Sequence, residues 1–246
     1  MENTAFSLQG KTILVTGASS GLGKQTAITI SQLGAKVILT GRNQERLQHT
    51  FDKLAGDGHS LVLADLTAGA DIQNLVSQCP SLHGVVYSTG ISEIKPARFV
   101  TADDIRKNFE VGFDAPVLLT TALLRGKKLV ANNCSLVFIS SISIRYPFVG
   151  GSMYISVKAA LENYARVLGL ELAPKGIRVN CVAPAFVKGP MLDQTRETTN
   201  QETINQIEAR QPLGLGEPED VSNTIAFYLS PASRWISGTS LLMGGG

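Results

Sequence analysis

The chain has 246 residues, of which 43% are hydrophobic and 17% are charged. This composition supplies enough apolar material for a folded core and too little charge for a disordered chain, so we expect a soluble globular protein. The formal net charge is only +2, which gives no electrostatic reason to expect binding to nucleic acid or to an anionic membrane.

Short apolar runs alternate along the chain with longer segments of helical periodicity. The runs at 13–15 and 136–139 are apolar throughout, which is typical of strands covered by helices on both faces. The predicted strands are Thr12–Thr16, Lys36–Thr40, Ser60–Ala64, Gly84–Ser88, Ser135–Ser140, Arg178–Ala183 and Ser240–Met243. The predicted helices are Leu22–Leu33, Gln44–Leu54, Ile72–Gln78, Ala102–Arg125, Met153–Leu172 and Pro218–Leu229.

This alternation predicts an α/β fold in which right-handed crossovers build a doubly wound parallel sheet. No linker, repeat or low-complexity tract interrupts it, so we expect residues 1–246 to form a single domain. The least regular range, 186–216, follows a predicted strand end, where open α/β sheets bind ligands. We expect a substrate lid there, and the alternative is an ordinary surface excursion.

The range 11–24 is a predicted strand that runs into a glycine-rich turn and then a helix. Gly17 permits a sharp turn, Gly21 lets a pyrophosphate approach the backbone, and Gly23 lets the helix pack close to the sheet. Free N–H groups and the helix dipole then face the phosphates. The pattern therefore predicts a dinucleotide-binding turn at the first strand–helix junction.

Two other motifs overlap this turn. Residues 17–21 match the G-x-S-x-G nucleophile elbow, but a hydrolase would need a histidine late in the chain and none follows His83. The same stretch also resembles a phosphate-binding P-loop, but Gly17 and Gly23 are one residue too far apart and Gln25 replaces the metal-binding Ser/Thr.

The residues after the second strand bear on the choice of dinucleotide. An acidic residue there bonds the ribose 2′-hydroxyl of NAD, whereas a basic residue suits the 2′-phosphate of NADP. Gly41 leaves room and Arg42 can clamp a phosphate with two hydrogen bonds, which predicts that NADPH is preferred over NADH; the alternative is a solvated arginine at a helix start. Asp65 could bond the adenine amino group or cap the next helix, and Gly90 would let the backbone pass close to the cofactor.

Tyr154 and Lys158 are four residues apart in a predicted helix and therefore neighbours on one face. A phenol titrates at about pH 10, and a nearby ammonium favours the phenolate and lowers that pKa. Tyr154 could then give a proton to a forming alkoxide or take one from an alcohol, while Lys158 holds the nicotinamide ribose. Ser141 could hold the substrate oxygen and stabilise developing charge. The alternative is a tyrosine packed on a lysine stem, with serines that only cap a strand end.

The cysteines and histidines give no sign of a metal site or of disulfides. The three cysteines, Cys79, Cys134 and Cys181, lie far apart in the sequence, which favours buried free thiols in a reducing compartment over a disulfide framework. The three histidines do not have the spacing of metal ligands. The N-terminal sequence lacks the basic start and apolar run of a signal peptide, and no apolar stretch is long enough to span a membrane. We expect a cytoplasmic protein.

Several motifs follow one another in a fixed order over nearly the whole chain. They are Thr16-Gly17-x-x-x-Gly21-x-Gly23, Asp65, Ser141, Tyr154-x-x-x-Lys158, Arg178-Val-Asn180-x-Val-x-Pro184, the run Pro212–Val221, and Gly238. Together they resemble the short-chain dehydrogenase/reductase family, in the single-domain branch that includes 3-oxoacyl-carrier-protein reductases. The resemblance implies a twisted seven-stranded Rossmann sheet and a homodimer or homotetramer.

The resemblance also implies roles for particular residues. The expected catalytic residues are Ser141, Tyr154 and Lys158. The expected cofactor-binding residues are Thr16, Gly17, Ser19, Ser20, Gly21, Leu22, Gly23, Arg42, Asn43, Asp65, Leu66, Gly90, Tyr154, Lys158, Pro184 and Val187. The expected reaction is NADP(H)-dependent hydride transfer between a carbonyl and an alcohol, on a small-molecule substrate that is either free or bound to a carrier.

Four positions depart from the family pattern. Gly112 stands where the family often has an asparagine that closes a proton relay to the lysine, and Asn108 lies one turn earlier. The range 87–90 reads Tyr-Ser-Thr-Gly instead of Asn-Asn-Ala-Gly, Ala185 replaces a glycine, and Gly189 replaces a threonine that binds the carboxamide. We expect slower proton exchange with the Ser-Tyr-Lys set intact. The departures also motivate an alternative, a catalytically weak dinucleotide-binding sensor or scaffold on the same fold.

Overall fold

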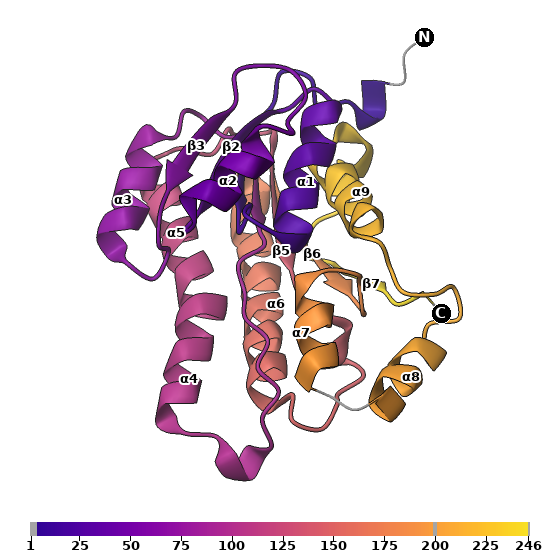
Figure 1. The fold of residues 1–246 in the computed structure, drawn as a ribbon. Helices are drawn as coiled ribbons and strands as arrows, with labels where there is room; N and C mark the ends of the chain where they lie inside the picture. The colour runs from indigo at the N-terminus through magenta and orange to yellow at the C-terminus, as the bar shows by residue number, and fades with distance from the viewer. Residues whose placement is uncertain (1–3, 199–200, 246) are drawn as a thin grey trace.

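The centre of the computed structural model, which describes residues 4–198 and 201–245, is a parallel sheet (Figure 1). Its seven strands run in the order β3-β2-β1-β4-β5-β6-β7, which confirms the predicted doubly wound sheet. The strands are β1 (Thr12–Thr16), β2 (Lys36–Gly41), β3 (Ser60–Leu63), β4 (Gly84–Tyr87), β5 (Cys134–Ile139), β6 (Ile177–Pro184) and β7 (Ser240–Met243). Each bound agrees with the predicted one to within one residue, because continuous apolar runs mark buried parallel strands clearly.

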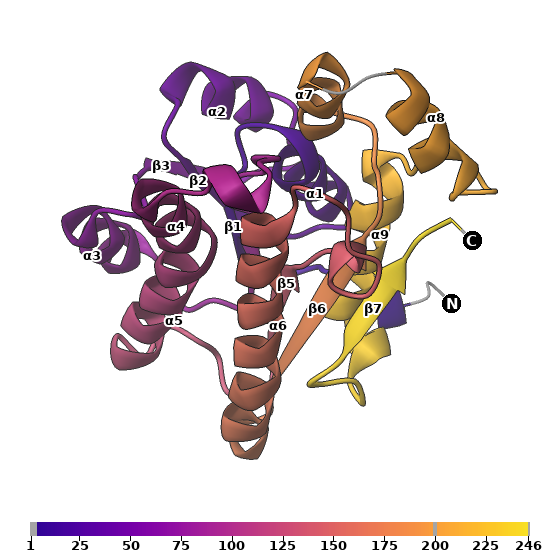
Figure 2. The same ribbon diagram turned by 90° about the horizontal axis from the view of Figure 1, so that it is seen from below.

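Helices cover both faces of the sheet (Figures 1 and 2). They are α1 (Gly21–Gln32), α2 (Gln44–Phe51), α3 (Gly69–Gln78), α4 (Ala102–Phe109), α5 (Ala115–Arg125), α6 (Ser152–Leu172), α7 (Pro190–Thr198), α8 (Gln201–Ala209) and α9 (Pro218–Leu229). Compared with the predicted helices, α2 ends three residues earlier and α3 begins three residues earlier. None of the helices among residues 4–198 and 201–245 is long and apolar enough to cross a membrane.

Two hydrophobic clusters form the core, one on each face of the sheet. Leu14 of β1 belongs to the cluster beneath α3, α5 and α6, whereas its neighbours Ile13 and Val15 belong to the cluster beneath α1, α2 and α9. Successive strand residues point to opposite faces, so a strand buried on both faces must be apolar at every position. The core therefore explains why the strands read as continuous apolar runs.

The predicted helix Ala102–Arg125 is not continuous, which corrects that expectation. Helix α4 is followed by a π-helical segment, Glu110–Asp114, in which the Ala115 N–H bonds to the Glu110 carbonyl five residues back. Pro116 lacks the N–H that would bond to the carbonyl of Gly112, so the regular ladder cannot pass this point. The wider turn therefore carries the chain from α4 into α5.

The range predicted as a substrate lid, 186–216, holds two helices, α7 and α8, that were not predicted; its residues 199–200 lie outside the described residues. A parallel bridge pairs Val187 with Gly216, and the Lys188 N–H donates to the Gly216 carbonyl at 2.9 Å. The two ends of the excursion are thus fixed together. The polar composition of the stretch concealed its helices, because few apolar residues mark a helical face there.

The strand order reverses between β1 and β4, whose carboxyl ends lie side by side at the centre of the sheet. This is the topological switch point, where a crevice forms because the two connecting chains diverge to opposite faces. The glycine-rich turn follows β1 and the range 88–90 follows β4, so both predicted segments meet there.

Candidate active site

The glycine-rich turn has the geometry expected of a phosphate cradle. Gly17 has a φ of +62°, and a Cβ there would lie 2.9 Å from the Ser88 carbonyl oxygen. A Cβ on Gly23 would overlap the Gly17 carbonyl, which confirms that the helix start packs against the turn. Gly21 has a φ of +52° and open space where a side chain would be. The turn is therefore closed toward the protein and open toward a ligand.

The start of α1 offers unbonded N–H groups to that open side. Ser20 is the N-cap residue of α1, and its side chain makes no capping hydrogen bond. Thr16 ties β1 to β4, because its hydroxyl accepts a hydrogen bond of 3.1 Å from the Ser88 N–H. Pyrophosphate oxygens fit such a site, since they accept from free N–H groups at the positive end of a helix.

A hollow borders this turn and reaches the first residues of the predicted lid. It is lined by Ser19, Ser20, Gly21, Lys24, Gln25, Arg46, His49, Gly189, Pro190 and Pro218. Its lining includes Lys24 and Arg46 but no carboxylate, which suits an anionic ligand. Leu22, also predicted to contact the cofactor, packs partly buried against the core beneath the turn.

Arg42 and Asp65 meet at the end where the adenosine is expected. Arg42 Nη1 lies 3.8 Å from Asp65 Oδ2, and its side chain is 68% exposed, so it remains accessible to a phosphate. Asp65 Oδ1 accepts from the N–H and hydroxyl of Thr67, which makes it a local turn residue and not the cap of α3. Burial acts to raise the pKa of Asp65, but the Thr67 hydrogen bonds and the Arg42 charge outweigh it and leave the pKa below its usual value. Asn43 caps α2 through a 2.8 Å bond from the Arg46 N–H.

The remaining predicted cofactor residues differ in what they can offer. Leu66 is 6% exposed and belongs to the core, so only its backbone is available to a ligand. A Cβ on Gly90 would lie 3.4 Å from Lys158 Nζ, which places the end of β4 beside the predicted catalytic lysine. Pro184 ends β6, and Val187 lies at the start of the predicted lid, where it pairs with Gly216.

The structure brings Ser141, Tyr154 and Lys158 together at the end of β5. Lys158 is 6% exposed, and its Nζ donates to the Ile139 carbonyl at 2.7 Å. The same Nζ lies 5.8 Å from the centre of the Tyr154 ring. The Ser141 side chain lies beside that of Tyr154, and Ser141 also caps the short helix Ile142–Ile144. The helix spacing and the strand end therefore converge as predicted.

The protonation behaviour of this group differs from the expectation. Burial raises the pKa of Tyr154 and the hydrogen bond to Ser141 offsets only part of that rise, so the lysine does not produce the predicted lowering in the protein alone. Burial also lowers the pKa of Lys158 to about 8. The phenol is therefore protonated at neutral pH, and the lysine keeps most of its charge.

Comparison with known proteins shows the family to which the chain belongs. A family model described as Enoyl-(Acyl carrier protein) reductase matches residues 17–246. The 3-oxoacyl-(acyl-carrier-protein) reductase FabG of Rickettsia felis is 33% identical over 241 residues, which are 97% of each chain. The chain belongs to the short-chain dehydrogenase/reductase family.

Other members of the short-chain dehydrogenase/reductase family are similar over the same extent. The BbsD subunit of (2S)-[(R)-hydroxy(phenyl)methyl]succinyl-CoA dehydrogenase from Thauera aromatica is 31% identical, with 97% of each chain covered. A solved dehydrogenase/reductase from Sinorhizobium meliloti 1021 superposes with a TM-score of 0.89 at 30% identity, covering 99% of this chain and 97% of that one. The similarity therefore extends to the whole fold.

The structure shows what surrounds the departures from the short-chain dehydrogenase/reductase pattern. A side chain at Gly112 would run into Cγ1 of Val157, so the place of the family's asparagine is filled from α6. Asn108 is buried and donates to the Asp104 carbonyl of its own helix at 2.8 Å, so its amide nitrogen is engaged within α4. Tyr87 stacks on Phe138 in the core with ring centres 4.2 Å apart, so it is a packing residue.

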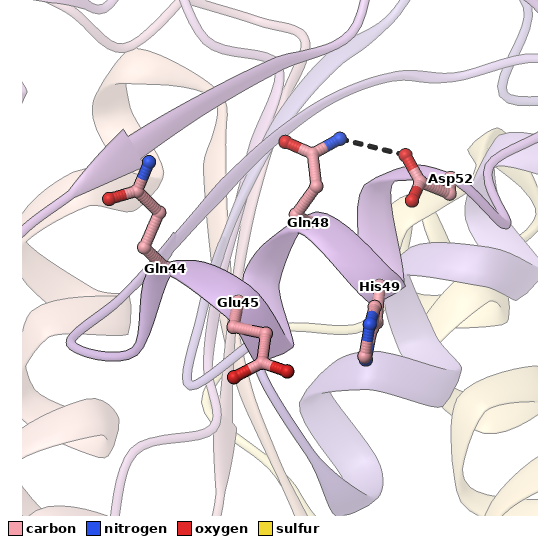
Figure 3. A pocket seen from close by; sticks show the side chains of 5 residues that line it. All are labelled: Gln44, Glu45, Gln48, His49 and Asp52. Atoms are coloured by element: carbon pink, nitrogen blue, oxygen red, sulfur yellow. Dashed lines mark hydrogen bonds between the residues drawn. The ribbon is translucent and has the colours of Figure 1, made fainter.

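A second hollow lies on the outside of α2 and shares only His49 with the hollow beside the glycine-rich turn. It is lined by Gln44, Glu45, Gln48, His49 and Asp52 (Figure 3). Gln48 donates to Asp52 across one helical turn at 2.7 Å. This lining is polar, exposed and without any predicted catalytic residue, so we assign it no chemical role.

One buried carboxylate near the predicted site of this short-chain dehydrogenase/reductase was missed from sequence. Glu162 is 5% exposed, and it lies one turn of α6 beyond Lys158. Its spacing of four from Lys158 is the signal that could have identified it, since i and i+4 residues share a helical face.

Proposed function

We propose that the protein is an NADP(H)-dependent oxidoreductase that interconverts a carbonyl and an alcohol by hydride transfer, with Tyr154 as general acid and base. The observation that carries this proposal is the convergence of Ser141, Tyr154 and Lys158 beside the switch point of the sheet. The open glycine-rich turn and the exposed Arg42 support the choice of cofactor.

When bound, the reduced nicotinamide would supply the hydride for the carbonyl carbon, and the residues of the chain would hold it and move the proton. Ser141 holds the carbonyl oxygen and stabilises the charge that develops on it. The Tyr154 hydroxyl delivers its proton to that oxygen as the alkoxide forms. Lys158 donates one of its three N–H groups to the Ile139 carbonyl, so two N–H groups remain that could bond to the ribose of the cofactor.

The protonation states of Tyr154 and Lys158 at neutral pH are compatible with a reduction. A general acid must hold its proton before the reaction, and burial keeps this phenol protonated. The lowered pKa of Lys158 means that its ammonium is lost as the pH rises above about 8. Reductase activity should therefore decline on the alkaline side of that value, as the cationic side chain beside the phenol loses its charge.

The substrate is proposed from the names of the relatives. FabG of Rickettsia felis is named for an acyl group on a carrier protein, and BbsD for a coenzyme A thioester. A small-molecule carbonyl, either free or joined to a carrier, is therefore the substrate class to test. The excursion 186–216 is proposed to cover it, because residues 189–190 border the hollow beside the glycine-rich turn.

The decisive experiment is NADPH oxidation with a panel of free ketones, acyl-coenzyme A thioesters and acyl-carrier thioesters. The Tyr154→Phe variant should lose about a hundredfold or more in kcat while retaining NADPH binding. Tyr164→Phe, on the same helix but packed into the core, is the matched control and should keep its activity. Tight NADPH binding without turnover of any carbonyl would favour the sensor or scaffold alternative, which the four departures from the family pattern motivate.

A homodimer or homotetramer remains part of the proposal. The outer face of α6 exposes Val167 and Leu170, the latter to 77%, and an apolar face of this kind is suited to burial against a second copy. Light scattering of the purified protein measures the mass directly, and a monomer at micromolar concentration would contradict this part of the proposal.

A further inference from the structure

Four polar residues follow one another along α6 at a spacing of four. They are Tyr154, Lys158, Glu162 and Arg166, and they occupy successive turns along one side of the helix. The first two are the proposed catalytic pair. Glu162 continues the row into the protein, where a carboxylate is costly to bury unless its oxygens are bonded.

Each oxygen of Glu162 has a partner. Oε1 accepts from Arg166 Nη2 at 2.7 Å, which supplies the countercharge. Oε2 accepts from two hydroxyls, those of Ser140 and Ser240, each at 3.0 Å. Ser140 directly follows β5 and Ser240 lies in β7, so one carboxylate oxygen bridges the two strands that flank β6.

The end of β5 shows why this bridge bears on the chemistry. Three consecutive residues lie against three members of the row: Ile139 accepts from Lys158, Ser140 donates to Glu162, and the Ser141 side chain lies beside Tyr154. Ser140 is therefore held between the two residues that contact the catalytic pair. Its backbone is also fixed, because its N–H donates to the Val182 carbonyl of β6 at 2.8 Å.

We propose that Glu162 is a positioning residue for the reaction, which acts through the Ser140 hydroxyl to hold Ser141 and the Ile139 carbonyl in place against Tyr154 and Lys158. This inference rests on the proposed function, since it concerns the geometry of the same proton transfer. The physical reason is that hydrogen-bonded side chains behind a site lock the groups that react, and small displacements of such groups reduce rates strongly.

The two hydroxyls on Oε2 provide a matched pair of variants. Ser140→Ala removes the bond to the catalytic strand, and Ser240→Ala removes the equally long bond to the edge strand. Both leave the carboxylate paired with Arg166. If Glu162 positions the site, Ser140→Ala should lower kcat about tenfold with the KM for NADPH nearly unchanged, whereas Ser240→Ala should leave kcat within about twofold of the wild type.

Glu162 itself is tested by Glu162→Ala and Glu162→Gln. The alanine variant should lose about as much kcat as Ser140→Ala, and the double variant of Ser140 and Glu162 should lose no more than either single one, because both changes cut the same link. Glu162→Gln should recover most of the loss, since an amide can still bond to the Ser140 hydroxyl. Thermal denaturation of each variant separates lost folding from lost positioning, and the glutamine variant serves if the alanine variant does not fold.

Three results would overturn the inference. Equal losses of kcat in Ser140→Ala and Ser240→Ala would mean that the carboxylate supports the fold alone, and additive losses in the double variant would mean that Glu162 and Ser140 act separately. Unchanged kcat in folded Glu162→Ala would remove the role outright. In each case the wild type still reduces carbonyls, so the proposed function survives; a wild type that reduces none removes both.

Discussion

Replacing Gly112 by asparagine restores the residue that the family often has at this point, but the structure predicts that the change alone is harmful. The new Cβ would overlap Val157 Cγ1, far inside the 3.4 Å at which ordinary contact begins. Val157 is 4% exposed and sits on α6 next to Lys158, so it has little freedom to move. Overpacking of this kind costs about 1–3 kcal/mol of the free energy of unfolding.

The assay is thermal denaturation of four proteins: the wild type, Gly112→Asn, Val157→Ala and the double variant. For a chain of this size the expected loss lowers the Tm by about 2–12 °C in Gly112→Asn. The double variant should be more stable than the sum of the two single changes predicts, because alanine at 157 vacates the space that asparagine needs.

The same proteins measure what the relay contributes. If the absent asparagine limits proton exchange, the double variant should turn over carbonyl substrate faster than Val157→Ala alone. Two results would refute the predicted overlap between a side chain at 112 and Val157: a Gly112→Asn variant as stable as the wild type, or a double variant whose loss of stability equals the sum of the two single losses. A lower turnover of Gly112→Asn by itself therefore cannot be attributed to the relay, since the overlap with Val157 also predicts it.

Three further predictions concern buried charge, cofactor choice and the phosphate turn. Burial lowers the pKa of Lys158 from 10.5 to about 8, so the unfolded chain binds more protons than the folded protein between these pH values. Lys158→Met should therefore abolish turnover but raise the free energy of unfolding at pH 7 by roughly 1–3 kcal/mol. Denaturant titrations should show that this gain in stability shrinks as the pH rises from 8 toward 10.5. Arg42→Ala should lower kcat/KM for NADPH by about tenfold or more with little change for NADH, and equal losses with both cofactors would contradict a 2′-phosphate contact. Gly23→Ala should weaken NADPH binding measured by calorimetry, because its methyl group meets the Gly17 carbonyl; an unchanged Kd would show that the turn can open.

Much of the fold was predictable because the strands carry a strong signal. The central strands β1, β4 and β5 are buried along nearly their whole length and are mostly apolar, so their limits coincide with the polar or glycine residues that bound them. The π-helical segment was not predictable from periodicity, since a single widened turn barely disturbs the apolar pattern, although Pro116 marked the place. Helices α7 and α8 were missed because few apolar residues mark their faces.

The candidate site was predictable to a different extent. The meeting of Ser141, Tyr154 and Lys158 followed from a helix spacing and a strand end, both of which are local features. The pKa of Tyr154 was not, because it depends on how deeply the ring is enclosed. The close approach of Val157 to the backbone at Gly112 brings together two helical segments distant in sequence. The hydrogen bond between Glu162 and Ser240 joins residues 78 positions apart. Neither contact can be recognised before the chain is folded.

The paired ends of the excursion at Val187 and Gly216 have a consequence for how this protein can diversify. A segment whose two ends are paired with each other can change in length or sequence while the elements on either side of it, β6 and α9, keep their places. Mutations could therefore accumulate in this proposed lid and alter which molecules it admits, while the proposed catalytic residues on α6 and after β5 stay unchanged. Within such an architecture, the range of compounds accepted can evolve independently of the chemistry performed on them.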